Sequence, residues 1–166
     1  HGESETNRDD LWTGWLDAPL TEKGRADAAL AGELLSHTHF DKIYSSDLCR
    51  AASTAEIAIP GCEYEKRTDL REICLGSLEG LPKDCITAEQ KATVAKEGYA
   101  SLGGESFADI EARMAAFVQE LEKLDCERVA IFTHAGWQRR FLDFVLGMKH
   151  PLKNIYCKTC ALGIFE

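Results

Sequence analysis

Residues 128–133, RVAIFT, constrain the fold of this chain more than any other stretch. They form a continuous apolar run bounded by polar residues, which is the pattern of a strand covered on both faces of its sheet. His134, Ala135 and Gly136 follow directly, and apolar residues then recur at helical spacing up to Gly147. A buried strand that turns at once into a helix is the unit from which parallel sheets are built.

The same order of strand, turn and helix recurs earlier in the chain. Residues 40–46 (FDKIYSS) read as a short strand, and Asp47 is placed to cap a helix that ends at the Pro60-Gly61 break. Further helices are expected within 17–35, with Thr21 as N-cap, and over 87–97 and 106–124, whereas 68–80 should form a loop and 161–165 a last strand. The alternation predicts one α/β domain over residues 1–166.

Composition limits the classes of partner. With 45% apolar and 28% charged residues, the chain reads as an ordinary soluble globular protein, and it contains no apolar run of the roughly 20 residues that span a bilayer. Its net charge of −9 argues against nucleic acid and against an anionic membrane surface. An anionic substrate would therefore need positive charge gathered locally in a pocket.

The seven cysteines are odd in number and lie in segments that read as regular structure. This distribution favours reduced thiols in a cytoplasmic protein over a disulfide framework. Cys157 and Cys160 form a lone CxxC without a second pair or an adjacent histidine, so ordinary thiols are favoured over a zinc or redox site.

Residues that could take part in catalysis fall in four loops, each expected to follow the carboxyl end of a strand. The loops contain His1-Gly2, residues 45–50, Arg71-Glu72 and residues 133–136. In open α/β sheets, ligands bind beyond the carboxyl ends of the strands, where such loops meet. A glycine follows His1 directly and His134 by two residues, and its missing side chain would let a ligand approach the backbone.

Together these pieces resemble the histidine phosphatase (phosphoglycerate mutase-like) superfamily over nearly the whole chain. The resemblance rests on six stretches in order: HGESETN, WTGWLDAPLTEKG, IYSSDLCRAASTAEI, LREICLGSLEG, GGES and VAIFTHAG. It implies a three-layer α/β/α sandwich with a mostly parallel central sheet. It also implies catalytic roles for His1, Arg50, Glu72 and His134, and substrate binding by Gly2, Asn7, Thr13, Gly14 and Ala135.

One departure stands at the start of the sequence. The family has an arginine immediately before its nucleophilic histidine and a strand before that arginine, whereas this sequence begins at His1. We expect both to precede His1 in the intact protein.

The family's chemistry accounts for these residue types. A neutral His1 can attack phosphorus and form a phosphohistidine if its other ring nitrogen donates to a backbone carbonyl. Arg50 and a protonated His134 would bind the equatorial oxygens, and Asn7 would add a neutral donor. Glu72 would protonate the departing alkoxide and then deprotonate the attacking water. No metal or other cofactor is required.

Three functions share this set of residues. The mutases of the family have a tyrosine-bearing motif after the acidic residue and a longer insertion with basic residues. Here Glu72 is followed by Ile-Cys-Leu-Gly, and the short insertion 81–103 holds three lysines but no arginine. The resemblance therefore favours a phosphatase similar to α-ribazole phosphatase or to broad-specificity phosphomonoesterases. A phosphoglycerate mutase and a non-catalytic binding module are the alternatives. The expected partner is a small-molecule phosphoester, with neither nucleic acid nor membrane, and a homodimer is compatible with the sequence.

Two further pairs of residues allow only general expectations. Trp12 and Trp15 flank Thr13-Gly14 and could either roof a pocket or anchor a loop. Arg139-Arg140 is expected to lie on an exposed helix face.

Overall fold

A computed structural model describes residues 1–147 and 158–164. Its sheet holds three parallel strands in the order β2-β1-β3, with β1 at Lys42–Ser46, β2 at Glu65–Arg67 and β3 at Val129–Phe132. Ser45 of β1 pairs with Lys66 on one side and with Phe132 on the other. The three strands therefore end at one edge of the sheet.

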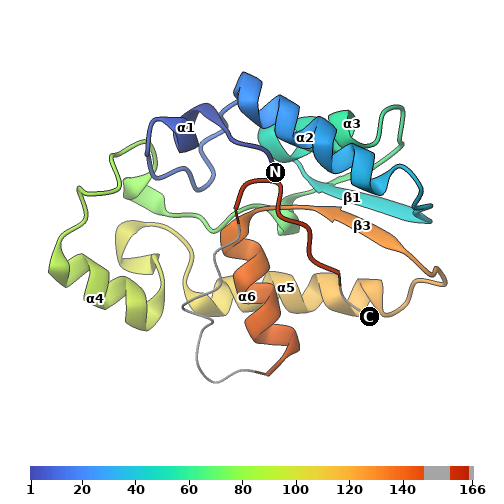
Figure 1. The fold of residues 1–166 in the computed structure, drawn as a ribbon. Coiled ribbons are helices and arrows are strands. Elements are labelled where there is room, and N and C mark those ends of the chain that lie inside the picture. Colours follow the sequence, from blue (N-terminus) through green and yellow to red (C-terminus); the bar gives the residue numbers. More distant parts are fainter. Residues whose placement is uncertain (148–157, 165–166) are drawn as a thin grey trace.

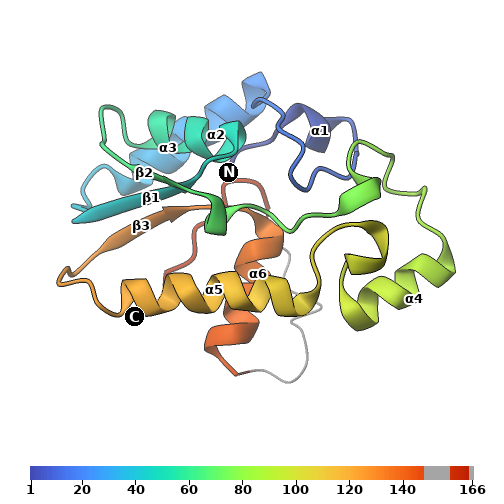
Figure 2. The ribbon, with the colours of Figure 1, turned by 180° about the vertical axis from the view of Figure 1, so that it is seen from behind.

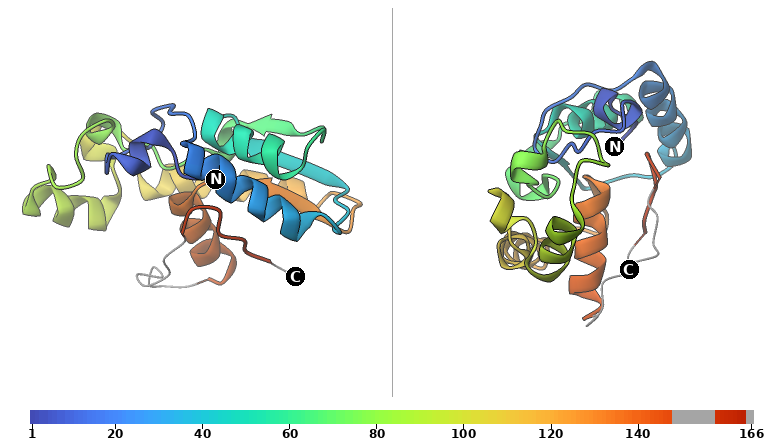
Figure 3. Two further views of the ribbon diagram at one scale, coloured as in Figure 1. Left: turned by 45° about the horizontal axis from the view of Figure 1, so that its top comes forward. Right: turned by 90° about the vertical axis from the view of Figure 1, so that its left-hand side faces the viewer.

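Helices cover both faces of this sheet. Helices α2 (Glu22–Leu35) and α3 (Cys49–Ala58) lie on one face, and α5 (Phe107–Leu121) and α6 (Ala135–Val145) lie on the other (Figures 1 and 2). Helix α4 (Ala88–Glu97) lies beyond the end of the sheet (Figure 3). The arrangement confirms the predicted three-layer α/β/α sandwich. The shorter elements are α1 (Glu5–Arg8) and the 3-10 turns η1 (Thr68–Leu70), η2 (Gly76–Leu78) and η3 (Ala100–Leu102).

Side-chain caps begin several of the helices. The Thr21 hydroxyl accepts a hydrogen bond from the Gly24 N–H, as its position in the sequence predicts. Thr87 and Ser106 each form a reciprocal capping box with the residue three positions later, at the start of α4 and of α5. These boxes satisfy N–H groups that the first helical turn leaves without partners.

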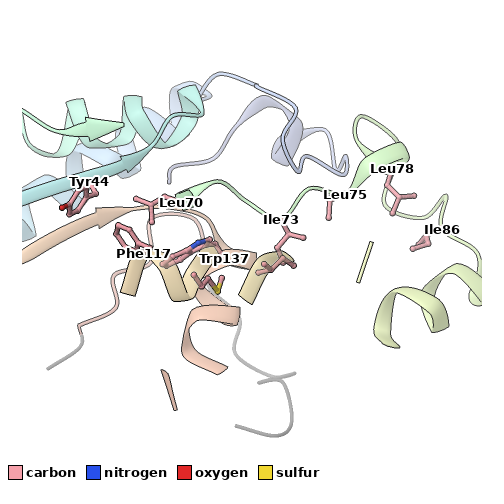
Figure 4. Packing of buried hydrophobic residues seen from close by; sticks show 10 residues of the cluster. Tyr44, Leu70, Ile73, Leu75, Leu78, Ile86, Phe117 and Trp137 are labelled. Carbon is pink, nitrogen blue, oxygen red and sulfur yellow. The ribbon is translucent and has the colours of Figure 1, made fainter. Parts of the chain in front are cut away.

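The apolar core lies on the α5 side of the sheet and continues toward α4 (Figure 4). Phe117 on α5 lies edge-on to Tyr44 of β1 at 5.5 Å and to Trp137 of α6 at 6.2 Å between ring centroids. The cluster extends through Leu75 to Ile86. Since Trp137 is three residues beyond His134, packing of α6 into this core fixes the turn that carries the histidine.

Local features of the structure differ from the sequence predictions. Asp47 does not cap α3: its carboxylate binds the Arg71 guanidinium, and Asp17 accepts the Cys49 N–H at 2.8 Å instead. Strand β2 lies inside a stretch that was not predicted to be a strand. Residues 161–164 form no strand, and Phe165 lies outside the described residues.

No helix within the described ranges is both long enough and apolar enough to cross a membrane.

Candidate active site

A cavity of about 240 Å³ lies beyond the carboxyl ends of the strands, where the predicted loops meet. The residues that line it are His1, Asn7, Leu11, Trp12, Thr13, Gly14, Arg50, Glu72, Ile73, Leu75, Lys83, Tyr99, Gly136 and Arg139. Six of the nine predicted site residues are therefore in this wall, and His134 lies directly behind it against His1.

The His1 ring is oriented by its own backbone. Its Nδ1 lies 2.6 Å from the carbonyl oxygen of Gly2. A carbonyl can only accept a hydrogen bond, so Nδ1 carries the proton and donates it. In the neutral ring, Nε2 then keeps its lone pair. This is the tautomer that a nucleophilic histidine requires.

Arg50 is a buried cation that no carboxylate neutralises among the described residues. Its side chain is 1% exposed, and its Nη1 and Nη2 donate to the carbonyls of Leu16 at 3.0 Å and Gly14 at 2.7 Å. Its Nε–H has no partner within the described protein. Burial lowers the pKa of Arg50, but a guanidinium starts from so high a value that it stays charged. Its charge is thus available to an anion.

His134 packs directly against His1. The two rings meet edge to face, with 4.9 Å between centroids. His134 is only 2% exposed, and neither ring nitrogen has a hydrogen-bond partner in the described structure. Burial, reinforced by the positive charge of Arg50, holds its pKa well below the ordinary value. His134 is therefore neutral in the protein alone, and an arriving dianion would favour its protonation.

The Glu72 carboxylate lies at the N-terminus of α6. It accepts hydrogen bonds from the N–H groups of Ile73 at 2.9 Å, Gly136 at 3.0 Å and Trp137 at 3.0 Å. The carboxylate thus occupies the place of a helix cap and faces the positive end of the helix dipole. A Cβ on Gly136 would stand 2.3 Å from Glu72 Oε1. Gly136 hence makes room for the Glu72 carboxylate.

Asn7 presents its donor end to the cavity. Its Oδ1 accepts hydrogen bonds from the backbone N–H and the hydroxyl of Ser4, at 3.1 and 2.9 Å. Because the backbone N–H can only donate, the amide orientation is fixed and Nδ2 is left for a ligand. Thr13 donates to the Thr6 hydroxyl at 2.9 Å. Gly14, whose φ is +51°, supplies the carbonyl that holds Arg50.

Besides His134, two further predicted site residues do not line the cavity. Gly2 is buried, and a Cβ there would stand 2.3 Å from the Gly24 carbonyl oxygen, so its small size serves packing against α2. Ala135 is the first residue of α6, next to the cavity-lining Gly136. Their predicted contacts with substrate stay predictions.

Most of the other residues that line the cavity are not predicted from the sequence to do so. Leu11, Ile73, Leu75 and Tyr99 supply apolar surface, and Lys83 and Arg139 supply charge. Arg139 is exposed as expected, yet it lines the cavity because it stands one helical turn beyond Gly136.

Each tryptophan takes one of the two roles considered for it. Trp12 lines the cavity, and its buried Nε1–H has no partner within the described residues. Trp15 anchors the loop instead, because its Nε1 donates to the Glu72 carbonyl at 2.7 Å.

The arrangement is suited to an anion with several oxygen acceptors. Leaving a buried donor without a partner costs about 1–3 kcal/mol. Arg50 Nε and the one protonated ring nitrogen of neutral His134 are such groups, and both residues lie beside His1. A phosphoryl group could accept from both. Over residues 1–147 and 158–164 no three His, Cys, Asp or Glu side chains are grouped to hold a metal ion.

The buried His134 should make stability depend on pH. In the unfolded chain its pKa is near the ordinary value of about 6.5, whereas in the folded protein it is lower. Between these values the unfolded state binds the extra proton, so acidification from pH 7.5 to 5.5 should lower the free energy of unfolding.

Replacing His134 separates its effect on the pH dependence of the free energy of unfolding from the effects of the other histidines. The free energy of unfolding of the wild type, minus that of a His134→Asn variant, should decrease as the pH falls through 6.5. Urea titrations across this range measure it. A difference independent of pH would contradict the assignment.

Comparisons with known proteins agree with this geometry. The chain is 40% identical to a 2,3-bisphosphoglycerate-dependent phosphoglycerate mutase of Bartonella henselae, over 99% of this chain and 86% of that protein. It resembles the solved structure of Bacillus stearothermophilus YhfR with a TM-score of 0.85 and 32% identity, over 96% of this chain and 84% of the other. A putative α-ribazole-5′-P phosphatase from Escherichia coli shares the fold, with a TM-score of 0.78 and 24% identity over 89% of this chain and 77% of that one. The model of the histidine phosphatase superfamily (branch 1) matches residues 1–166, and the chain therefore belongs to that superfamily.

Proposed function

We propose that the chain hydrolyses phosphomonoesters of small metabolites through a phosphohistidine on His1. One observation carries the proposal: an imidazole with a free Nε2 lone pair packs against a buried cluster of donors that have no partners of their own. Preorganised donors of this kind stabilise the charge of a transferring phosphoryl group.

The reaction then proceeds in two displacements. His1 Nε2 bonds to phosphorus while the ester P–O bond breaks, and the leaving oxygen takes a proton from the Glu72 carboxyl group. The Glu72 carboxylate next removes a proton from water, whose oxygen attacks phosphorus and releases His1 and inorganic phosphate. Arg50, His134 and Asn7 Nδ2 bind the phosphoryl oxygens throughout.

A mutase would use the same phosphohistidine but pass the phosphoryl group to a second phosphoglycerate instead of to water. The Bartonella henselae relative, named as a mutase, favours this alternative. The insertion 81–103 favours hydrolysis, because it contains no arginine and, of its lysines, only Lys83 lines the cavity.

The cavity also suggests the type of leaving group. Beyond the residues assigned to the phosphoryl group, Lys83 and Arg139 are the cations that line it. Among the described residues, Lys83 is paired only with the exposed Asp10, and an exposed ion pair of this kind contributes little to stability. We infer that the preferred substrates carry a second anionic group, such as a carboxylate.

Loss of the nucleophile tests the proposed reaction. The wild type should hydrolyse p-nitrophenyl phosphate without added metal and form an acid-labile, alkali-stable phosphoenzyme, and His1→Ala should abolish both. Conversion of 3-phosphoglycerate to 2-phosphoglycerate in the presence of bisphosphoglycerate would identify a mutase. Binding of phosphate without turnover of any phosphoester would identify a binding module and refute the catalytic proposal.

A substitution at Gly136, which contacts the Glu72 carboxylate, tests the role of Glu72 as the general acid. In Gly136→Ala the new Cβ overlaps the carboxylate, which is flexible and must move away from the helix N-terminus. Since misplacement of a reacting group by about 1 Å can cost up to 100-fold in rate, kcat should fall by about 10- to 100-fold. Steady-state kinetics measure this, and a circular dichroism spectrum checks the fold. Unchanged kcat would show that the contact is unimportant.

Two neighbouring arginines give a matched test of the second anionic group. Arg139→Ala should weaken competitive inhibition by 3-phosphoglycerate by about five- to tenfold, corresponding to roughly 1 kcal/mol, and leave inhibition by inorganic phosphate unchanged. Arg140→Ala removes the same charge, but that guanidinium lies over the Phe107 ring at 3.9 Å and does not line the cavity. Equal effects of the two variants would exclude a specific subsite.

A further inference from the structure

The loop that leads to Glu72 is held in place by side chains. Residues 69–72 belong to no strand, so their carbonyls lack sheet partners. Each carbonyl nevertheless accepts a hydrogen bond from a side chain. Arg113 donates to the carbonyls of Asp69 at 2.8 Å, Arg71 at 2.8 Å and Glu72 at 3.1 Å. Trp137 also donates to Asp69 at 2.9 Å, Trp15 to Glu72 at 2.7 Å, and Thr133 to Leu70 at 2.8 Å. Arg113 alone holds three of the four.

The remaining donors of Arg113 bind one carboxylate. Its Nε and Nη2 donate to the two oxygens of Glu105 at 2.7 and 3.0 Å, and the two side chains are 14% and 12% exposed. Glu105 Oε2 also accepts the Cys74 N–H at 2.8 Å. The Arg113–Glu105 pair thus binds the chain on both sides of Glu72. Arg113 binds carbonyls of residues 69–72, and Glu105 binds the N–H of Cys74.

Arg113 differs from the cations that could bind a ligand. Its charge is neutralised by Glu105, all its bonds go to the protein, and it does not line the cavity. An effect of Arg113 on protonation of the leaving group is therefore expected to act through the position of Glu72, whereas its charge also helps to lower the pKa of His134.

We propose that Arg113 and Glu105 are positioning residues, which fix Glu72 at the leaving-group oxygen and so govern protonation of the leaving group. The inference rests on the proposed function, in which Glu72 is the general acid. Replacing Arg113 with lysine is enough to test this role. The planar guanidinium binds several acceptors at once, and an ammonium group cannot replace it in that geometry.

Substrates that differ in their need for an acid separate this role from a structural one. Benzyl, phenyl and p-nitrophenyl phosphate form a series of similar size with increasingly acidic leaving groups. The alkoxide of benzyl alcohol needs a proton in the transition state, whereas p-nitrophenolate departs without one. The value of kcat/KM reports only the steps up to phosphoryl transfer to His1, so hydrolysis of the phosphohistidine does not affect it.

In Arg113→Lys we expect kcat/KM for benzyl phosphate to fall by about 10- to 100-fold, and for p-nitrophenyl phosphate to change less than about threefold. The slope of log kcat/KM against leaving-group pKa should therefore become steeper. Glu105→Gln, which keeps the shape of the side chain, should change the slope in the same direction and serves if the lysine variant does not fold. Equal losses across the series would overturn the inference.

Two further variants complete the test. Arg67→Lys alters another largely buried arginine, 18% exposed, that binds Glu120 and the Asp69 side chain but no carbonyl of the loop. It should lower thermal stability and leave the slope unchanged. Glu72→Gln should reproduce the steep slope. If it does and Arg113→Lys does not, the positioning role fails while the proposed function stands; if Glu72→Gln leaves the slope unchanged, the role of Glu72 in the proposed function fails.

Discussion

The parallel pairing of β1 with both of its neighbours is the constraint on which the rest of the structure depends. The register that sets Ser45 opposite Phe132 and Lys66 ends all three strands at the same level. The chain leaving β1 reaches Arg50 within one turn of α3, the chain leaving β2 reaches Glu72, and the chain leaving β3 reaches His134 directly. A shift of one strand by one residue would turn its side chains to the opposite face and separate these groups.

Bringing the groups together costs folding free energy. Arg50 and His134 are among the most buried side chains of the protein, and both keep donors without protein partners. Each such donor costs about 1–3 kcal/mol, and burial also forces His134 into its neutral form. The apolar contacts between Trp137 of α6 and Phe117 of α5 help to offset this cost. The donors consequently need little rearrangement when a phosphoryl group arrives.

The sequence predicted much of the fold because its signals were local. Thr21 at a helix start, the apolar face of α5 and the run RVAIFT each specify an element through near neighbours. Strand β2 is not predicted from the sequence, because its residues Glu-Lys-Arg are largely exposed and show no alternation of apolar and polar residues. Asp47 has the right residue type for a cap, but the Arg71 guanidinium, distant in sequence, competes for its carboxylate. The resemblance to the family gave His1, Arg50 and Glu72 as candidate site residues, and all three line the cavity, whereas the contact between Gly136 and Glu72 required the tertiary structure.

The roles of the arginines show why composition and motif cannot assign charge to a site. Arg67, Arg71 and Arg113 each bind at least one carboxylate, which offsets their positive charge, and they hold segments of the fold together. Arg50 is held by two carbonyls, which orient the guanidinium without cancelling its charge. The net charge of the chain is −9, so carboxylates are abundant. A binding site for anions therefore depends less on the number of cations than on one cation having no carboxylate partner. Glu72, the acidic residue that the proposed mechanism requires, satisfies the same rule, because backbone N–H groups rather than Arg50 hold its carboxylate.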